Sequence, residues 1–223
     1  MNLLLYRAEL PCHTLIKRIY YLLESLSTFI NMTKAVFLDR DGTLNYEIKG
    51  DLTRPAQLRL YKNVPEALKL LRQAGYKLIV VTNQSLIARG LIPESGLGLI
   101  HQRLKGLLDK KGVRLDRIYY CPHHPTRGTV KRFTKVCDCR KPEPGMLKQA
   151  IRDFRVDPKQ SFFIGDTVRD MGAARKMGIK FILLLTGYGR ATLKEIAKKE
   201  PAFISGNLLK ACKFIVRTEN INV

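Results

Sequence analysis

The 223-residue sequence contains no uninterrupted apolar run long enough to cross a membrane. The apolar stretches near its start are broken by Arg7, Lys17 and Glu24, whereas a transmembrane helix needs about 20 consecutive apolar residues. The start also lacks the ordered basic, apolar and small-residue regions of a secretion signal, so we expect a cytoplasmic protein. Internal repeats and low-complexity tracts are absent too, which argues against a solenoid or a disordered chain.

Acidic side chains are scarce. There are 19 Asp and Glu residues against 40 Lys and Arg residues, which gives a formal net charge of +21. Such a balance is typical of proteins that bind nucleic acids or anionic surfaces. The basic residues are scattered, however, and no nucleic-acid-binding signature accompanies them. A positive field also attracts phosphorylated metabolites, so we expect a small phosphorylated ligand and neither a nucleic-acid nor a membrane partner.

Short apolar runs alternate with amphipathic segments along most of the chain. The runs at 35–38, 78–81, 117–120, 162–164 and 181–185 are typical of buried strands, and the segments 64–74, 93–111, 144–154 and 170–177 are typical of helices. This alternation predicts an α/β fold with a doubly wound parallel sheet in a single domain. No insertion is long enough for a large cap domain, so we expect the loops 45–62 and 121–139 to border the functional site.

Two carboxylates follow the first apolar run. Asp39 comes directly after residues 35–38, Asp41 is two positions on, and Gly42 allows the backbone to turn tightly. Open α/β sheets bind their ligands at the carboxyl ends of such buried strands. The pair therefore has the layout of an aspartate nucleophile with a nearby acid, although Asp-Gly after a strand is also a common turn.

Three further polar segments make the functional interpretation more specific. They are Thr82-Asn83-Gln84-Ser85, Arg140-Lys141, and Asp166 with Asp170. In this order the four segments resemble the haloacid dehalogenase superfamily of aspartate-dependent phosphotransferases, over residues 34–187. The strings TNQSLIARG at 82–90, YYCPHHP at 119–125 and VCDCRKP at 136–142 are most similar to the D-glycero-D-manno-heptose-1,7-bisphosphate 7-phosphatase family, with the related histidinol phosphatases as the main alternative.

The resemblance implies a role in phosphoryl transfer for several of these side chains. Asp39 would form an aspartyl-phosphate, and Asp41 would act as general acid and base, which requires a raised pKa. Thr82 would donate its hydroxyl to a phosphoryl oxygen, and Lys141 would balance negative charge. Because carboxylates facing a phosphate dianion require a hard cation, we expect Mg²⁺, held by Asp39, the backbone carbonyl of Asp41, and Asp166.

Other residues are expected to contact the substrate. The resemblance assigns this role to Asn83, Gln84, Ser85, Arg140 and Lys141. The alternatives are a polar loop or helix cap for residues 82–85 and an ordinary surface group for the lysine. Asp170 either supports the metal or stabilises the positive start of the helix that follows it. Two departures from the family pattern, Leu86 in place of glycine and Thr167 in place of lysine, bear on the substrate.

Cysteine usage gives an independent signal. Cys121-x-His123 and Cys137-x-Cys139 form two tight pairs separated by a loop rich in Pro, Gly, Lys and Arg, which predicts a tetrahedral structural zinc site. A disulfide or free thiols are the alternatives, and the lack of a secretion signal disfavours the disulfide. Spacing does not separate His123 from His124, whereas the family pattern favours His123. Zinc would order this loop and fix the two cationic residues that follow it.

The sequence thus predicts a Mg²⁺-dependent phosphomonoester hydrolase that uses an aspartyl-phosphate intermediate. The resemblance favours the 7-phosphate of heptose 1,7-bisphosphate, on the route to the heptose of lipopolysaccharide core, in a monomeric enzyme. A phosphatase for histidinol phosphate or another small sugar phosphate is the alternative, and an inactive basic adaptor for nucleic acid is a remote one.

The family pattern also bears on the start of the chain. Relatives begin just before the first motif, and Met32 offers an alternative start there. We therefore expect residues 1–31 to be an upstream extension, artefactual or poorly ordered, and residues 32–223 to form the phosphatase domain. An amphipathic membrane anchor is the functional alternative for the extension.

Overall fold

A six-stranded parallel sheet organises the protein. The computed structural model describes residue 17, residues 32–48, residues 50–196 and residues 200–220. The strands are β1 (Ala35–Leu38), β2 (Lys77–Asn83), β3 (Arg117–Cys121), β4 (Phe162–Gly165), β5 (Lys180–Leu184) and β6 (Phe203–Ser205). Their spatial order is β3-β2-β1-β4-β5-β6, and all neighbours pair in parallel. The order reverses direction at β1, as in doubly wound folds, which confirms the predicted fold class.

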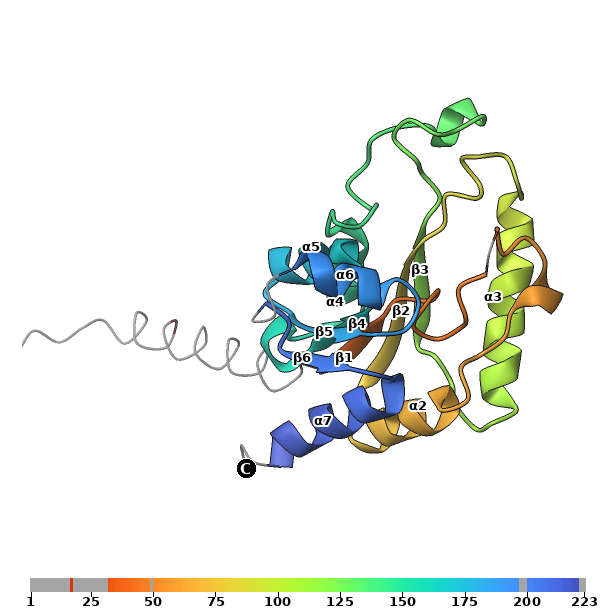
Figure 1. The fold of residues 1–223 in the computed structure, drawn as a ribbon. Helices are drawn as coiled ribbons and strands as arrows, with labels where there is room; N and C mark the ends of the chain where they lie inside the picture. The colour runs from red at the N-terminus through yellow and green to blue at the C-terminus, as the bar shows by residue number, and fades with distance from the viewer. Residues whose placement is uncertain (1–16, 18–31, 49, 197–199, 221–223) are drawn as a thin grey trace, which may run out of the picture. The chain divides into compact units, whose positions relative to one another are not determined.

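Helices cover both faces of the sheet, as Figure 1 shows. One face carries α2 (Val64–Gln73), α3 (Glu94–Asp109) and α7 (Leu208–Asn220), and the other carries α4 (Gly145–Phe154), α5 (Val168–Lys176) and α6 (Gly189–Glu195). Three short 3-10 helices complete the described elements: η1 (Pro55–Gln57), η2 (Lys131–Phe133) and η3 (Pro158–Gln160). None of the described helices combines the length and hydropathy that crossing a bilayer requires.

The hydrophobic core lies in two layers, one on each side of the sheet. Val36 and Leu38 of β1 pack into the layer beneath α2, α3 and α7, while Ala35 and Phe37 pack into the layer beneath α4 and α5. All four side chains are fully buried. Alternate residues of a strand point to opposite faces, so a strand that is covered on both sides needs an unbroken apolar run. This requirement explains why β1 is apolar throughout.

The helices are amphipathic, and α2 shows why they form where they do. Pro65 lies in its first turn, where a backbone N–H would have no partner within the helix. Glu66 lies in the same turn, where its negative charge interacts favourably with the positive end of the helix dipole. Val64, Leu68 and Leu71 recur at helical spacing and are completely buried. Burying a side chain of this size contributes about 1.5–3 kcal/mol, so the tertiary contacts of this face stabilise the helix more than its intrinsic propensity does.

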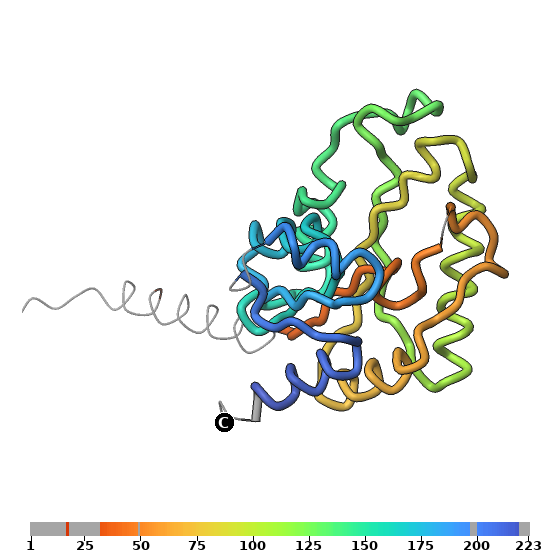
Figure 2. Tube along the Cα trace, viewed as in Figure 1, coloured from red at the N-terminus to blue at the C-terminus, as the bar shows by residue number. Residues whose placement is uncertain are grey.

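Two loops border the carboxyl edge of the sheet, as expected. The flap, which we define as residues 45–62, includes η1 and lies beside α3. The loop between β3 and α4 lies beside the segment that follows β2, where the carbonyl of Ala88 accepts hydrogen bonds from the amides of Thr129 (2.9 Å) and Val130 (3.0 Å) (Figure 2). The part of the chain that the structure describes contains no large cap domain, in agreement with the sequence.

The predicted strands and helices are all present, with ends that differ by a few residues. The sequence did not predict β6, α6 or α7, and α5 begins at Val168 rather than at residue 170. The prediction that residues 1–31 are an extension falls on a segment of which only Lys17 is described, and it stays a prediction.

Candidate active site

The carboxyl ends of the central strands bring the predicted catalytic side chains together. Asp39 follows β1, Thr82 lies near the end of β2, and Asp166 follows β4. Since β1 lies between β2 and β4, these side chains meet at one edge of the sheet. Lys141 enters from the segment before α4, and all four residues line one cavity.

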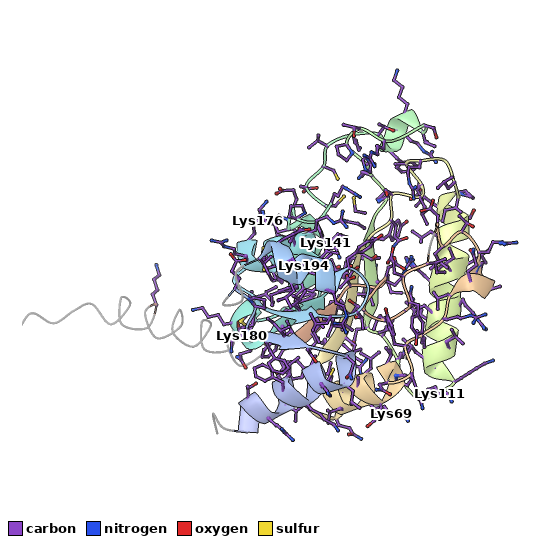
Figure 3. All side chains as sticks on the ribbon, in the orientation of Figure 1. Lys69, Lys111, Lys141, Lys176, Lys180 and Lys194 are labelled. Carbon is purple, nitrogen blue, oxygen red and sulfur yellow. The ribbon has the colours of Figure 1, made fainter. Side chains whose placement is uncertain are left out.

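Lys141 is a deeply buried cation of this site. Its Nζ donates to the carbonyl of Val81 (2.7 Å) and forms ion pairs with Asp39 Oδ1 (3.0 Å) and Asp170 Oδ1 (2.5 Å). Burial alone would lower the pKa of Lys141, but the carboxylates of Asp170 and Asp39 raise it above its ordinary value. Its side chain is 2% exposed, so the surface-lysine alternative is wrong. In Figure 3, Lys141 lies inside the protein, whereas Lys69 and Lys111 lie at its periphery.

Two glycines leave room for the carboxylate of Asp166. A Cβ on Gly42 or on Gly187 would lie 2.1 Å from Asp166 Oδ2, and both glycines have positive φ angles. The backbone amide of Tyr188 donates to the same oxygen (2.7 Å), while Oδ1 is buried without a hydrogen-bond partner. Burial, followed by the charges of Asp39 and Asp170, raises the pKa of Asp166 to about 8. The unpaired oxygen and the repulsion indicate a place for a cation.

The carboxylates of Asp39, Asp166 and Asp170 form a group that could hold a metal ion. One oxygen of each lies within 4.8 Å of the others, and all three residues are buried. Burial and the charge of Asp170 raise the pKa of Asp39 to about 6. Oxygen-only donors and concentrated negative charge suit Mg²⁺, which binds through few carboxylates and keeps its waters. This donor set fits a hard cation and would repel an unneutralised phosphate.

Asp170 takes part in the start of the following helix, which is one of the two roles that the sequence left open, while its support of a metal stays a prediction. Its carboxylate pairs with Lys141 and also accepts hydrogen bonds from the amide (3.0 Å) and the hydroxyl (2.6 Å) of Thr167. Together with the hydrogen bond from the Asp170 amide to Thr167 Oγ1, these contacts form a capping box at the start of α5. Thr167 thus fixes Asp170, which in turn fixes Lys141.

Asp41 is held as a carboxylate by Arg40, a residue that sequence reasoning missed. Arg40 Nη2 lies 2.8 Å from Asp41 Oδ2, and the side chains of Asn45 and Gln84 donate to Asp41 as well (2.8 and 2.9 Å). Although burial raises the pKa of Asp41, Arg40 and these hydrogen bonds lower it overall. The expectation of a raised pKa is therefore wrong for the protein without substrate, because the sequence does not reveal which partners surround the carboxyl.

Arg40 itself is almost completely buried, with 1% of its surface exposed. Its Nη1 lies 3.3 Å from Nε2 of His101, which faces it from α3. Burial and the charge of Arg40 lower the pKa of His101 to about 3, so this imidazole is neutral at physiological pH. A neutral His101 can accept a hydrogen bond from the guanidinium without adding charge.

The polar segment after β2 mainly positions other groups. The Asn83 amide bonds both the N–H and the carbonyl of Lys141 (3.0 Å each), and Gln84 Nε2 donates to Asp41 and to Thr82 Oγ1 (2.9 Å each). Ser85 is half-buried and lines the adjoining cavity. Asn83 and Gln84 also line cavities, so the prediction that these residues touch substrate stays open beside their positioning contacts.

Two adjoining cavities of about 110 Å³ and 150 Å³ form the accessible part of the site. They share Asp41, Glu47 and Asn83, so a ligand can extend from one into the other. Burial, followed by Asp41 and Asp39, raises the pKa of Glu47 to about 7. Arg169 and Tyr188 also line the first cavity, and no sequence pattern pointed to either.

The two cysteine pairs converge on one point beside this site. Cys121, His123, Cys137 and Cys139 each offer a ligand atom within 4.8 Å of the others. The Sγ atoms of the three cysteines lie 3.1–3.6 Å apart, and His123 Nδ1 lies 3.3 Å from Cys139 Sγ. Tetrahedral zinc with bonds of about 2.3 Å separates its sulfurs by about 3.8 Å, so a small expansion admits the ion. The described cysteines form no disulfide.

The two adjacent histidines differ in their surroundings. Only His123 belongs to the metal-ligand group, while His124 Nδ1 accepts hydrogen bonds from the amides of Thr126 (3.2 Å) and Arg127 (2.8 Å). Arg140 donates to the carbonyl of His123 (2.9 Å) and lines neither cavity. Its predicted contact with substrate stays a prediction, since the structure shows it bound to the loop.

Comparisons with known proteins agree on one group of relatives. A family described as HAD-hydrolase-like matches residues 138–211. The D-glycero-beta-D-manno-heptose-1,7-bisphosphate 7-phosphatase of Pasteurella multocida is 42% identical over 185 residues, which are 82% of this chain and 97% of that protein. The protein of the same name from Escherichia coli K12 is 43% identical over 155 residues, 69% of this chain and 80% of that protein.

A solved structure with a similar fold belongs to a protein of the same kind. The D,D-heptose 1,7-bisphosphate phosphatase from B. bronchiseptica, crystallised with magnesium and phosphate, has a TM-score of 0.75 and 32% sequence identity to this chain. The match covers 83% of this chain and 99% of that one. Similarity therefore extends over the whole fold that carries the site.

Proposed function

Because the chain belongs to the D-glycero-beta-D-manno-heptose-1,7-bisphosphate 7-phosphatase family of haloacid dehalogenase-like phosphatases, we propose that it removes the 7-phosphate of heptose 1,7-bisphosphate. The observation that carries this proposal is the meeting of Asp39, Lys141 and Asp166 in one cavity, with Asp41 beside them. The product would serve the synthesis of lipopolysaccharide core heptose.

Asp39 is the proposed nucleophile. Its Oδ1 accepts from the Arg40 amide (2.7 Å) and pairs with Lys141, which leaves Oδ2 to attack phosphorus. The transfer gives an aspartyl-phosphate and divides one difficult hydrolysis into two easier steps. Lys141 keeps the attacking carboxylate ionised and in place, and the hydroxyl of Thr82 can donate to a phosphoryl oxygen.

Asp41 is the proposed acid and base. The negative phosphate beside it would raise its pKa on substrate binding, so that it can protonate the leaving sugar oxygen. In the second step the same group must take a proton from the attacking water. The lowered pKa of Asp41 in the free protein suits this second role, since Arg40 holds it ionised.

Asp39, Asp166 and the backbone carbonyl of Asp41 would hold Mg²⁺, with Asp170 as a supporting carboxylate. The ion would neutralise charge on the transferring phosphoryl group. A structural zinc would be held by Cys121, His123, Cys137 and Cys139. We keep the expectation of a monomer as part of this proposal.

Substrate preference is the direct test. Catalytic efficiency is measured on heptose 1,7-bisphosphate, fructose 1,6-bisphosphate and histidinol phosphate at saturating Mg²⁺. We expect heptose 1,7-bisphosphate to be preferred by at least about tenfold, with phosphate released from carbon 7. A preference for histidinol phosphate would reject this substrate but would leave the nucleophile and the metal site unaffected.

The stabilisation by Mg²⁺ is expected to grow with pH. In the metal-free protein the pKa of Asp39 is raised to about 6 and that of Asp166 to about 8, so folding favours the protonated form of both carboxyl groups. The stability that this protonation contributes is complete below about pH 4 and is lost as pH rises through these two values. At pH 5 protons compete with Mg²⁺ for these carboxylates, whereas at pH 8 Asp39 is ionised, so added Mg²⁺ should raise the melting temperature by several degrees at pH 8 and much less at pH 5. Asp166→Asn should abolish the pH 8 effect. Equal stabilisation at both pH values would contradict this prediction.

Loss of one zinc ligand is expected to destabilise the loop between β3 and α4. Cys139→Ser should lose bound zinc, lower the melting temperature and reduce activity, because Arg140 and Lys141 directly follow the ligand. Zinc per chain is measured by elemental analysis alongside thermal unfolding. Cys212→Ser is the control for zinc content, since Cys212 is a buried free cysteine on α7 outside the ligand group. Full zinc occupancy in Cys139→Ser, or none in the wild type, would refute the site.

A further inference from the structure

A second cavity, of about 190 Å³, shares no lining residue with the active-site cavities. It lies where the flap, the starts of α2 and α7, and the segment after β5 meet. Tyr46 lines this cavity, whereas the next residue, Glu47, lines the active site. Successive flap side chains thus face two different cavities, and the proposed phosphatase reaction uses only one of them.

This second cavity contains a buried hydroxyl group that has no hydrogen-bond partner. Thr43 lines it, is 1% exposed, and its Oγ1 has no hydrogen-bond partner. Buried hydroxyls in folded proteins normally have a partner, so a group of this kind indicates that a ligand or water completes it. The neighbouring Thr186 is different, because its hydroxyl donates to the Gly42 carbonyl (2.6 Å).

The electrostatic surroundings favour an anion. Among the residues that line the cavity, Lys62 carries the single formal charge. Val64 begins α2 and Leu208 begins α7, so the positive ends of two helices of 10 and 13 residues border the same space. Asn207 Oδ1 accepts a hydrogen bond from the amide of Lys210 (2.9 Å) at the start of α7. Asn63 makes no side-chain capping bond. Helix N-termini attract negative charge, and phosphate is a common ligand of such ends.

Aromatic side chains form part of the wall. The rings of Tyr46 and Tyr61 lie with centroids 4.0 Å apart, and each presents a phenol beside the hydroxyl and amide groups already named. Such walls accommodate the body of a small organic compound whose charged end is bound elsewhere. We propose that this cavity is a second binding site, for a phosphate group that is either free or carried by a small phosphorylated compound.

Binding is tested by calorimetry on the full-length protein without added Mg²⁺. Under these conditions the active site lacks the cation that would link phosphate to the carboxylates of Asp39, Asp166 and Asp170. The two probes are orthophosphate and the non-hydrolysable phosphonate analogue of a hexose 6-phosphate. We expect saturable binding of one molecule per chain. Tighter binding of the phosphonate would identify an organic phosphate as the ligand, and tighter binding of orthophosphate would identify the free anion.

Charge reversal at Lys62 provides the first discriminating variant. Lys62→Glu should weaken binding by about tenfold or more, because it places a negative charge beside the anion. Lys69→Glu is the matched control, since it makes the same change at an exposed position of α2 that does not line the cavity (Figure 3). Equal binding by Lys62→Glu and the wild type, or no binding of either probe to the wild type, would overturn the proposal.

Thr43→Val separates a ligand-binding hydroxyl from a structural one. Valine has nearly the same shape, and removing an unpaired buried hydroxyl does not lower stability. We therefore expect an unchanged or higher melting temperature together with binding weakened several-fold. Unchanged binding at unchanged stability would show that the hydroxyl does not contact the anion, and would remove the central observation for the site. These measurements do not depend on turnover, so they stay informative if the proposed substrate is wrong.

Discussion

Asp39→Asn is expected to abolish Mg²⁺-dependent phosphate release while leaving the fold intact. Asparagine has the same shape, but its amide neither attacks phosphorus nor supplies the charge that binds the cation. Loss of a covalent nucleophile removes the whole two-step route, so the rate should fall by about 10³-fold or more. Stopped-time assays of phosphate release under saturating Mg²⁺ measure this loss.

Stability measurements separate this effect from misfolding. Burial and the charge of Asp170 raise the pKa of Asp39, so its ionised form destabilises the metal-free protein above about pH 6. Asparagine carries no such charge, and the variant should be at least as stable as the wild type at pH 8 without Mg²⁺. Asp109→Asn is the control, because Asp109 is an exposed carboxylate at the end of α3. Undiminished release by Asp39→Asn would exclude Asp39 as the nucleophile.

The sequence revealed those site residues whose positions follow from strand order. Asp39, Thr82 and Asp166 each come at or near the end of an apolar strand, and parallel strands end at the same edge of a sheet. Their proximity was therefore predictable before the structure. The contacts of Arg40 with Gln84 and His101 were not, because these two partners come from other parts of the chain. No local spacing encodes these contacts.

The same distinction applies to the fold. β1 and β2 are covered on both faces, so their unbroken apolar runs are visible in the sequence. β6 has only three residues, two of them half-buried, at the edge of the sheet, and it pairs only with β5 among the described strands. α7 buries its apolar face against α2 and the sheet. A short edge strand and a terminal helix become stable through such contacts, which local patterns do not reveal.

Lys141→Met should cause the largest loss of stability among the predicted variants. The Lys141 ammonium separates the carboxylates of Asp39 and Asp170, and its side chain is 2% exposed. Methionine fills similar space without charge, so two buried carboxylates would lose their shared partner. Removing one member of a buried ion pair destabilises proteins by about 3–5 kcal/mol, and we expect a loss of this order at pH 8. Phosphate release should also fall by at least about 10²-fold.

The pH dependence identifies charge as the cause. The pKa of Asp39 is already raised to about 6, and losing Lys141 raises it further. Protonation relieves the repulsion at low pH, so the deficit in unfolding free energy should shrink between about pH 8 and pH 5. Urea denaturation at both pH values measures it. Lys111→Met, at an exposed lysine just beyond α3, is the control and should match the wild type. A deficit that is the same at both pH values would indicate lost packing and would contradict the electrostatic role of Lys141.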